Sequence, residues 1–162
     1  MAEDQSYPRV KKFFFLFIFI LSFSKAYSEN FKFIKIANLN NPWGSSFLNN
    51  DEMIITEKSG LIKIVNIINN QVNDVEHNLN FLEDGQGGLL DILHQENKVW
   101  ISYTENRGNG KTSTSIALAN LDKKNLVFKN IFQANPPINS GYHFGSRLAI
   151  KDNYLYASAG ER

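Results

Sequence analysis

Cysteine is absent from the 162 residues of this chain, so no disulfide can stabilise it and the fold must depend on its own hydrophobic core. An excess of charge is also missing, because 17 Lys and Arg side chains are balanced by 16 Asp and Glu, a net charge of +1. A near-neutral chain lacks the basic surface that binding to nucleic acid or an anionic membrane requires. The content of 43% hydrophobic and 20% charged residues is typical of a globular protein, and the length favours one domain.

A membrane-length hydrophobic run is missing as well. The apolar stretch at residues 13–23 has eleven residues, whereas a membrane-spanning helix needs about 20. Three basic residues lie within residues 9–12, and the small-residue pattern Ala26-Tyr27-Ser28 follows the stretch. These are the three regions of a secretory signal peptide, and we predict cleavage after Ser28.

We therefore divide the chain into residues 1–28, an N-terminal extension plus signal peptide, and residues 29–162, the mature domain. Without residues 1–28, 13 basic and 14 acidic side chains remain, a net charge of −1. We expect an exported protein, periplasmic or extracellular, with no stable membrane span after cleavage and no nucleic acid partner. Residues 1–10 precede the usual start of a leader; an over-long choice of start codon and a tolerated polar extension both explain them.

Strand patterns dominate the mature domain, and no long helical period appears. The segment Lys58-Ser59-Gly60 suits a tight hairpin, because glycine accepts the positive φ that a short connection needs. The sequence therefore predicts an all-β fold. The predicted strands are Phe31 to Leu39, Ser46 to Glu57, Leu61 to Ile68, Thr112 to Asn120 and Leu126 to Phe132.

Three strand endings resemble one another: Met53 to Glu57, Ile101 to Glu105 and Ala157 to Glu161. Their glutamates are 48 and 56 residues apart. A unit recurring at about 50 residues has the spacing of β-propeller blades, each a four-stranded antiparallel sheet. The other reading is a β-sandwich whose hairpins look alike by chance.

Two glycine-rich segments stand immediately before apolar strands: Gly85-Gln86-Gly87-Gly88-Leu89-Leu90-Asp91 and Gly141-Tyr142-His143-Phe144-Gly145-Ser146-Arg147-Leu148. In each, glycines bring the backbone close around a polar side chain, as a ligand-facing turn at the end of a sheet requires. These segments predict a binding or catalytic site.

Five segments in this order and spacing resemble the soluble sugar dehydrogenases that use pyrroloquinoline quinone (PQQ), the glucose/sorbosone dehydrogenase-like family. The segments are Asn41 to Gly44, Thr56 to Gly60, Gly85 to Asp91, Ile101 to Tyr103 and His143 to Leu148. The resemblance covers about Pro42 to Arg162 and implies the N-terminal part of a six-bladed β-propeller. It implies oxidation of an aldose or related polyol by hydride transfer to PQQ, which the family binds together with Ca²⁺.

The resemblance places His143 on the position of the family's catalytic base. Imidazole suits this role because its unperturbed pKa of about 6.5 leaves it able to accept a proton near neutral pH. The other reading is a hydrogen-bonded core or surface histidine. His77 and His94 lack such a setting, and we expect surface or packing roles for them, since their spacing gives no zinc-ligand pattern.

Gln86 matches a family glutamine that faces cofactor and substrate, and an amide can donate to and accept from hydroxyl or quinone oxygens. Its other reading is a turn residue bound to its own loop. Tyr142 departs from the family, which commonly has a small or acidic residue before the histidine. Its ring can stack on a pyranose or narrow the central opening of the propeller, so the sequence does not decide which substrate is preferred. For Trp43 we expect a core position rather than a ligand contact.

Structural support of the site is the role we expect for Arg147, Asp91, Gly85 and Gly145. The other reading of Arg147 is a cation near the carboxylates of the quinone. The acidic group at residues 83, 84 and 91 is too sparse for a calcium site, so we assign no metal-ligating residue.

The family's arginines for the quinone and its calcium-binding carbonyls lie on later blades, which have no counterpart up to Arg162. We therefore expect an incomplete gene product, inactive on its own, whose sheets have unpaired edges. The main competing function is a non-catalytic secreted propeller that binds carbohydrate or protein. A calcium-dependent lactonase-type propeller would need a cluster of acidic and Asn side chains around the metal, and none is evident.

Overall fold

The structure is a computed structural model that describes residues 31–161, and these residues form strands, turns and loops but no helix. The chain divides into two units, residues 1–34 and 35–162, and the second contains every strand. The predicted signal peptide lies outside the described residues, and the boundary after Ser28 stays a prediction. The strands are β1 (Pro42–Phe47), β2 (Glu52–Glu57), β3 (Leu61–Asn66), β4 (Val72–His77), β5 (Leu89–Gln95), β6 (Lys98–Asn106), β7 (Thr112–Asn120), β8 (Asn125–Leu126), β9 (Lys129–Gln133), β10 (Leu148–Lys151) and β11 (Tyr154–Ala157).

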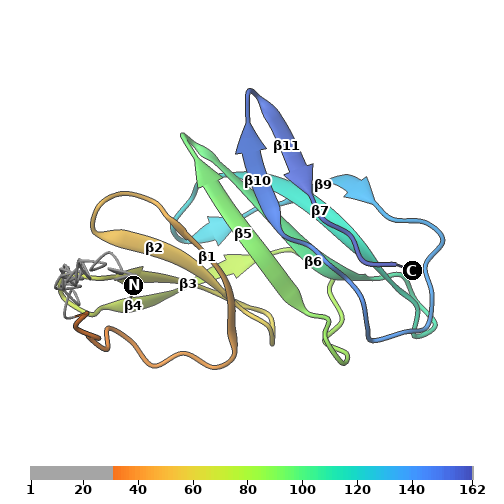
Figure 1. Cartoon of the computed structure of the whole chain (residues 1–162), viewed down its shortest axis with the longest axis horizontal. Coiled ribbons are helices and arrows are strands. Elements are labelled where there is room, and N and C mark those ends of the chain that lie inside the picture. The colour runs from red at the N-terminus through yellow and green to blue at the C-terminus, as the bar shows by residue number, and fades with distance from the viewer. Residues whose placement is uncertain (1–30, 162) are drawn as a thin grey trace, which may run out of the picture. The chain divides into compact units, whose positions relative to one another are not determined.

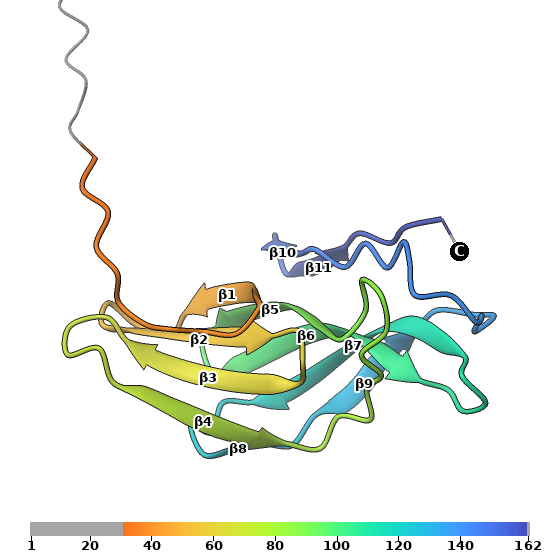
Figure 2. The same cartoon turned by 90° about the horizontal axis from the view of Figure 1, so that it is seen from below.

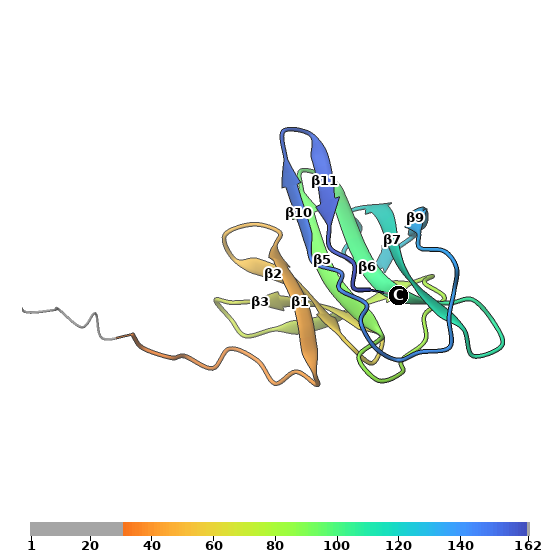
Figure 3. The same ribbon diagram turned by 45° about the vertical axis from the view of Figure 1, so that its right-hand side comes forward.

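The strands form three sheets in chain order (Figures 1 and 2). The first has the order β1-β2-β3-β4 and gains the short β8 in parallel beside β4. The second has the order β5-β6-β7-β9, and the third is the hairpin β10-β11; the pairing in both is antiparallel. The first strands of successive sheets are neighbours, with β5 between β1 and β10 (Figures 1 and 3).

The hydrophobic core lies mainly between the first two sheets, where alternate residues of their strands face each other. Ile54 and Ile64 pair across β2 and β3, and both are buried. The predicted hairpin joins these strands, and Gly60 at its tip has φ 107°. The buried cluster comprises Ile54, Ile62, Ile64, Val75, Leu89, Ile92, Val99, Ile101, Tyr103, Ala117, Ala119, Leu126 and Phe128.

Three of the five predicted strands need correction. Residues 31–39 form no strand, because β-forming side chains produce one only where a neighbouring strand pairs with them. The predicted strand from Ser46 to Glu57 is two strands, β1 and β2, separated by a turn in which the Leu48 N–H donates to the Glu52 carbonyl over 2.9 Å. The predicted strand from Leu126 to Phe132 is likewise divided, into β8 and β9.

Two further features differ from the expectations. Trp43 lies on β1 with 47% of its surface exposed, so its predicted core position is wrong. Strand β4 was not predicted, because its polar residues outnumber its two valines, Val72 and Val75, of which only Val75 is buried.

A buried hydroxyl group connects the first sheet to the second. The Thr56 hydroxyl accepts the Gly44 N–H over 2.9 Å and donates to the Leu90 carbonyl of β5 over 2.5 Å. Gly44 must be glycine here, since a Cβ atom would lie 2.7 Å from the Leu90 carbonyl oxygen. We call this arrangement a bridging hydroxyl: it accepts from the first strand of its own sheet and donates to the next sheet.

The second sheet repeats the bridging hydroxyl. The Ser102 hydroxyl accepts the Asp91 N–H over 3.0 Å and donates to the Ser146 carbonyl, which leads into the third sheet, over 2.6 Å. In the third sheet the Ser158 hydroxyl accepts the Arg147 N–H over 3.0 Å. Thr56 and Ser102 lie on the second strands of their sheets, and Ser158 directly follows β11, so the three sheets have similar hydroxyl contacts at corresponding places.

The face of the second sheet opposite the Ser102 hydroxyl carries a separate polar network around Glu105. Its carboxylate accepts from the Ser115 hydroxyl over 2.6 Å and from the side-chain amides of Asn130 and Gln133. Tyr103 donates to the Asn130 side-chain carbonyl over 2.7 Å, and burial raises the pKa of Tyr103 to about 12, so the phenol keeps its proton at neutral pH.

We expect Thr56→Val to lower the free energy of unfolding by about 1 to 3 kcal/mol, because it leaves a buried donor and a buried acceptor without their partner at constant side-chain volume. Urea denaturation followed by circular dichroism measures the change. Thr56→Ser keeps the hydroxyl and serves as the control; equal loss in both variants would contradict a role for the bridging hydroxyl.

Candidate functional site

The two glycine-rich segments, far apart in sequence, lie against each other. The Gln86 N–H donates to the Gly141 carbonyl over 2.7 Å, and the His143 N–H donates to the Gln86 side-chain carbonyl over 3.0 Å. Gln86 therefore binds the second segment at two points, from its backbone and from its side chain. The structure brings together Gln86, Tyr142 and His143, which the sequence placed in the cofactor and substrate site.

The close approach of the two segments depends on their glycines. Gly85 has φ 54°, and a Cβ atom there would lie 2.4 Å from the Gly141 carbonyl oxygen. Gly145 has φ 68°, and its Cβ atom would lie 2.6 Å from the Gly160 nitrogen. A side chain at position 85 would push the two segments apart, and one at position 145 would push the second segment away from residues 159 and 160.

His143 presents its imidazole to solvent. Its side chain is 57% exposed, and its Nδ1 lies 3.6 Å from the Glu161 Oε1, beyond hydrogen-bond distance. The ring of Tyr142, also exposed, stands edge-on to the imidazole with centroids 6.5 Å apart. His143 has φ 62°, a left-handed conformation that is unfavourable for a non-glycine residue and marks functional sites. The arrangement leaves the imidazole accessible from solvent.

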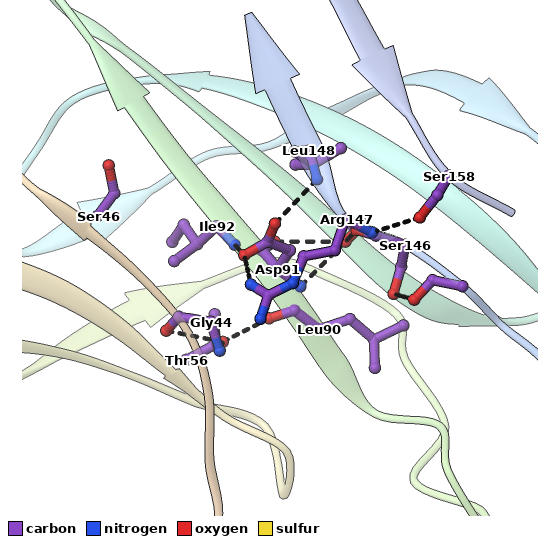
Figure 4. A network of polar contacts seen from close by, with 12 residues as sticks. Gly44, Ser46, Thr56, Leu90, Asp91, Ile92, Ser146, Arg147, Leu148 and Ser158 are labelled. Atoms are coloured by element: carbon purple, nitrogen blue, oxygen red, sulfur yellow. Dashed lines mark hydrogen bonds and ion pairs between the residues drawn. The ribbon is translucent and has the colours of Figure 1, made fainter. Parts of the chain in front are cut away.

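Asp91 fixes the end of the His143 segment (Figure 4). Its buried carboxylate accepts the Leu148 N–H over 2.8 Å through Oδ2, and its Oδ1 accepts the Ile92 N–H over 3.1 Å. The Arg147 guanidinium also donates to Oδ1 over 3.1 Å. Asp91 lies on β5 and Leu148 begins β10, so this carboxylate joins the second sheet to the third.

The Arg147 side chain is 77% exposed despite its ion pair with Asp91. Its backbone takes part in the third sheet, since the Arg147 N–H donates to the Ser158 hydroxyl. The pairing with Asp91 agrees with an anchoring role for Arg147.

The other two histidines lie outside this site. The His77 ring bonds to the Gly60 carbonyl through Nε2 over 2.8 Å, and the His94 Nδ1 bonds to the Phe47 carbonyl over 3.1 Å. Both rings thus contact backbone of neighbouring strands or turns, in keeping with the packing roles expected for them.

Metal ligands do not gather in the part of the chain that the structure describes: no three His, Asp or Glu side chains there could hold an ion. The carboxylate of Asp91 is engaged by Leu148 and Arg147. Residues 31–161 also contain no helix that is long and apolar enough to cross a membrane.

Sequence reasoning missed four buried hydroxyl side chains beside the site: Ser102, Thr104, Thr112 and Thr114, which are at most 4% exposed. Their signal was visible in Thr112-Ser-Thr-Ser115, where small polar residues occupy a strand that the pattern otherwise marks as buried. A buried strand rich in Thr and Ser indicates hydrogen bonds made out of the sheet, because buried hydroxyl groups need partners.

Known proteins resemble this chain in sequence and fold. The family model for glucose/sorbosone dehydrogenase matches residues 39–162. The curated aldose sugar dehydrogenase YliI of Escherichia coli K12 is 30% identical over 133 residues, which are 76% of this chain and 36% of that protein. A crystal structure of a glucose dehydrogenase is 29% identical, with TM-score 0.70 over 76% of this chain and 39% of its own. The PQQ-bound aldose sugar dehydrogenase of Streptomyces coelicolor, 22% identical, has TM-score 0.68 over 79% of this chain and 40% of its own, and supports the fold alone.

The fold is all-β and of the propeller type, with the first two sheets as blades, as the sequence predicted. The chain belongs to the glucose/sorbosone dehydrogenase family, as the five ordered segments predicted. It spans about two-fifths of the length of the relatives it matches.

We expect Gly85→Ala to destabilise the chain by about 2 kcal/mol more than Gly108→Ala. Both positions have positive φ, so both variants bear the left-handed cost of about 1 kcal/mol, but only the Gly85 methyl group meets backbone; Gly108 has open space around it. Chemical denaturation of the two variants measures the difference. Similar losses would show that the two glycine-rich segments do not depend on close contact.

We also expect Asp91→Ala to cost about 3 kcal/mol, because the buried Leu148 N–H loses its acceptor, whereas Arg147→Ala costs about 1 kcal/mol or less, since its guanidinium is largely exposed. Urea denaturation at neutral pH measures both. A larger loss for Arg147→Ala would reverse the assignment and make the ion pair the main support of the segment.

Proposed function

We propose that this chain contributes the proton-accepting part of a quinoprotein sugar dehydrogenase, which oxidises an aldose or related polyol by hydride transfer to PQQ. The observation that carries the proposal is the His143 imidazole, exposed on a backbone that Gln86 binds at two points. Membership of the glucose/sorbosone dehydrogenase family and the likeness to an aldose sugar dehydrogenase support the substrate class.

His143 acts as the general base in this proposal. Bound PQQ supplies the hydride acceptor, and the substrate hydroxyl loses its proton as the hydride leaves. The Nδ1 atom faces Glu161, so the neutral imidazole presents Nε2 as the proton acceptor when Nδ1 carries the hydrogen. Glu161 then faces the charged imidazolium that forms, although its own high exposure keeps this contact weak.

Gln86 and Tyr142 bind the ligands in this proposal. The carbonyl oxygen of the Gln86 side chain already accepts the His143 N–H, so its Nε2 is the group that donates to a quinone oxygen or a sugar hydroxyl. The exposed ring of Tyr142 offers a flat apolar face for a pyranose beside the imidazole. The amide donor of Gln86 fits the oxygens of PQQ, which is bound in the structurally similar Streptomyces coelicolor enzyme.

Other parts of the proposal extend beyond residues 31–161. No step of the proposal passes through Ca²⁺, because no three His, Cys, Asp or Glu side chains of residues 31–161 form a group that could hold an ion. We further propose an exported protein, on the evidence of the leader-like residues 1–28.

The test is dye reduction by the complete gene product that carries this chain, after reconstitution with PQQ and Ca²⁺ and with a panel of aldoses. We expect turnover in the parent protein and a fall in kcat of about 100- to 10,000-fold in His143→Gln, because the variant has no general base. His94→Gln is the control, since the His94 ring contacts Phe47 away from the site.

Two results would count against the proposal. Unchanged kcat in His143→Gln would remove His143 from the chemistry. Calorimetric binding of a sugar without dye reduction by the parent protein would make the chain part of a non-catalytic carbohydrate-binding propeller.

A further inference from the structure

The face of the second sheet below the His143 segment is lined by hydroxyl groups. Thr112 and Thr114 alternate along β7, and Thr104 of β6 pairs with Thr114 in the register, so all three side chains face one side. Ser102 is two residues from Thr104 and shares that face. Their burial makes the arrangement costly unless each hydroxyl has a partner.

Three of these hydroxyls donate to carbonyls of the segment that carries His143. Thr112 donates to the Ser140 carbonyl over 3.2 Å, and Thr114 donates to the Phe144 carbonyl over 2.9 Å. The Ser102 hydroxyl donates to the Ser146 carbonyl over 2.6 Å.

The fourth hydroxyl holds the other glycine-rich segment. Thr104 accepts the Gly88 N–H over 3.1 Å, and its own N–H donates to the Gly88 carbonyl over 2.9 Å. One sheet face therefore contacts both segments of the candidate site.

The contacts of Thr112 and Thr114 have no counterpart in the first sheet. Thr56 of β2 is opposite Ile62 of β3 in the first sheet. In the second sheet, Ser102 of β6 is likewise opposite Ile116 of β7. In the first sheet the hairpin closes directly beyond this pair, since β2 and β3 have six residues each. In the second sheet β6 and β7 have nine residues each and continue past the pair. This extension carries Thr104, Thr112 and Thr114.

The extension lies below a backbone that needs support. His143, Gly145 and Ser146 have φ values of 62°, 68° and 87°, and the left-handed region costs a non-glycine residue about 1 to 2 kcal/mol. The hydroxyl donors fix the carbonyls on both sides of His143, at Ser140, Phe144 and Ser146. They thereby orient the peptide planes that set the direction of the imidazole.

We propose that Ser102, Thr112 and Thr114 are positioning residues, which hold the backbone of residues 140–146 in its left-handed course and so direct His143 toward the substrate. This inference rests on the proposed function of His143 for its catalytic consequence. The placement of the backbone itself is independent of that function and is tested separately.

The first measurement is amide hydrogen exchange of the full chain by NMR, with Thr114→Val compared with Thr114→Ser. We expect the His143 and Ser146 amides to exchange about tenfold faster in Thr114→Val, because the Phe144 carbonyl loses this donor at constant volume. Thr114→Ser keeps the hydroxyl and is expected within about twofold of the parent chain.

The matched control is Ser113→Ala. Ser113 is equally buried on the same strand, but its hydroxyl faces the other side and accepts from Arg107 over 3.0 Å. We expect Ser113→Ala to lower Tm without accelerating exchange at His143 and Ser146. Equal acceleration in Ser113→Ala and Thr114→Val, or none in Thr114→Val and Ser102→Ala, would overturn the proposal.

The second measurement is dye reduction with PQQ and an aldose by the complete gene product. We expect Thr114→Val to lower kcat about tenfold or more with little change in KM, and Thr114→Ser to restore it, because a misdirected base slows chemistry more than binding. Accelerated exchange together with an inactive parent protein would support the backbone role and reject the proposed function. Unchanged kcat despite accelerated exchange would overturn the positioning role.

Discussion

The buried carboxylate of Asp91 is the constraint on which the site depends. It lies on β5 and accepts the N–H of Leu148, the first residue of β10, so the second and third sheets meet at one charged group. A buried carboxylate is stable only when hydrogen bonds or a cation compensate for the lost water, and here the donors come from both sheets. Because Gln86 binds Gly141, the segment that carries His143 is fixed at both of its ends.

The bridging hydroxyls explain why the repeat is visible in the sequence and yet weak. Thr56, Ser102 and Ser158 occupy similar places in successive sheets, and each accepts an N–H from the first strand of its own sheet or from the residue just before that strand. This contact requires only a small side chain with a hydroxyl group, while the neighbouring residues are free to differ. A fold repeated through such contacts conserves a few polar atoms rather than a long apolar pattern, which limits how far periodicity alone can reveal it.

The sequence predicted the all-β class, the β2–β3 hairpin and the strand Thr112–Asn120, because these depend on local alternation and on glycine at a turn. It also brought Gln86 and His143 into one site through their segments. The prediction of a strand at residues 31–39 was wrong because strand pairing depends on a partner distant in sequence. The predicted core position of Trp43 was wrong because nothing local shows which face of β1 is covered. The role of the hydroxyl donors that bind the His143 segment was not predicted for the same reason, because their carbonyl acceptors lie about 30 to 45 residues further along the chain.

The position of His143 is set by backbone contacts, and this separates the chemistry of the site from its selectivity. Gln86, Thr114 and Ser102 all bind main-chain atoms of the segment, so they hold the imidazole whatever the neighbouring side chains are. Tyr142, in contrast, is exposed, and its ring contacts only the edge of the imidazole. A change at Tyr142 therefore alters the exposed surface beside the imidazole without loosening the backbone that carries His143. Under the proposed function, such a division would let one scaffold keep its proton acceptor while the residue beside it adapts to different sugars.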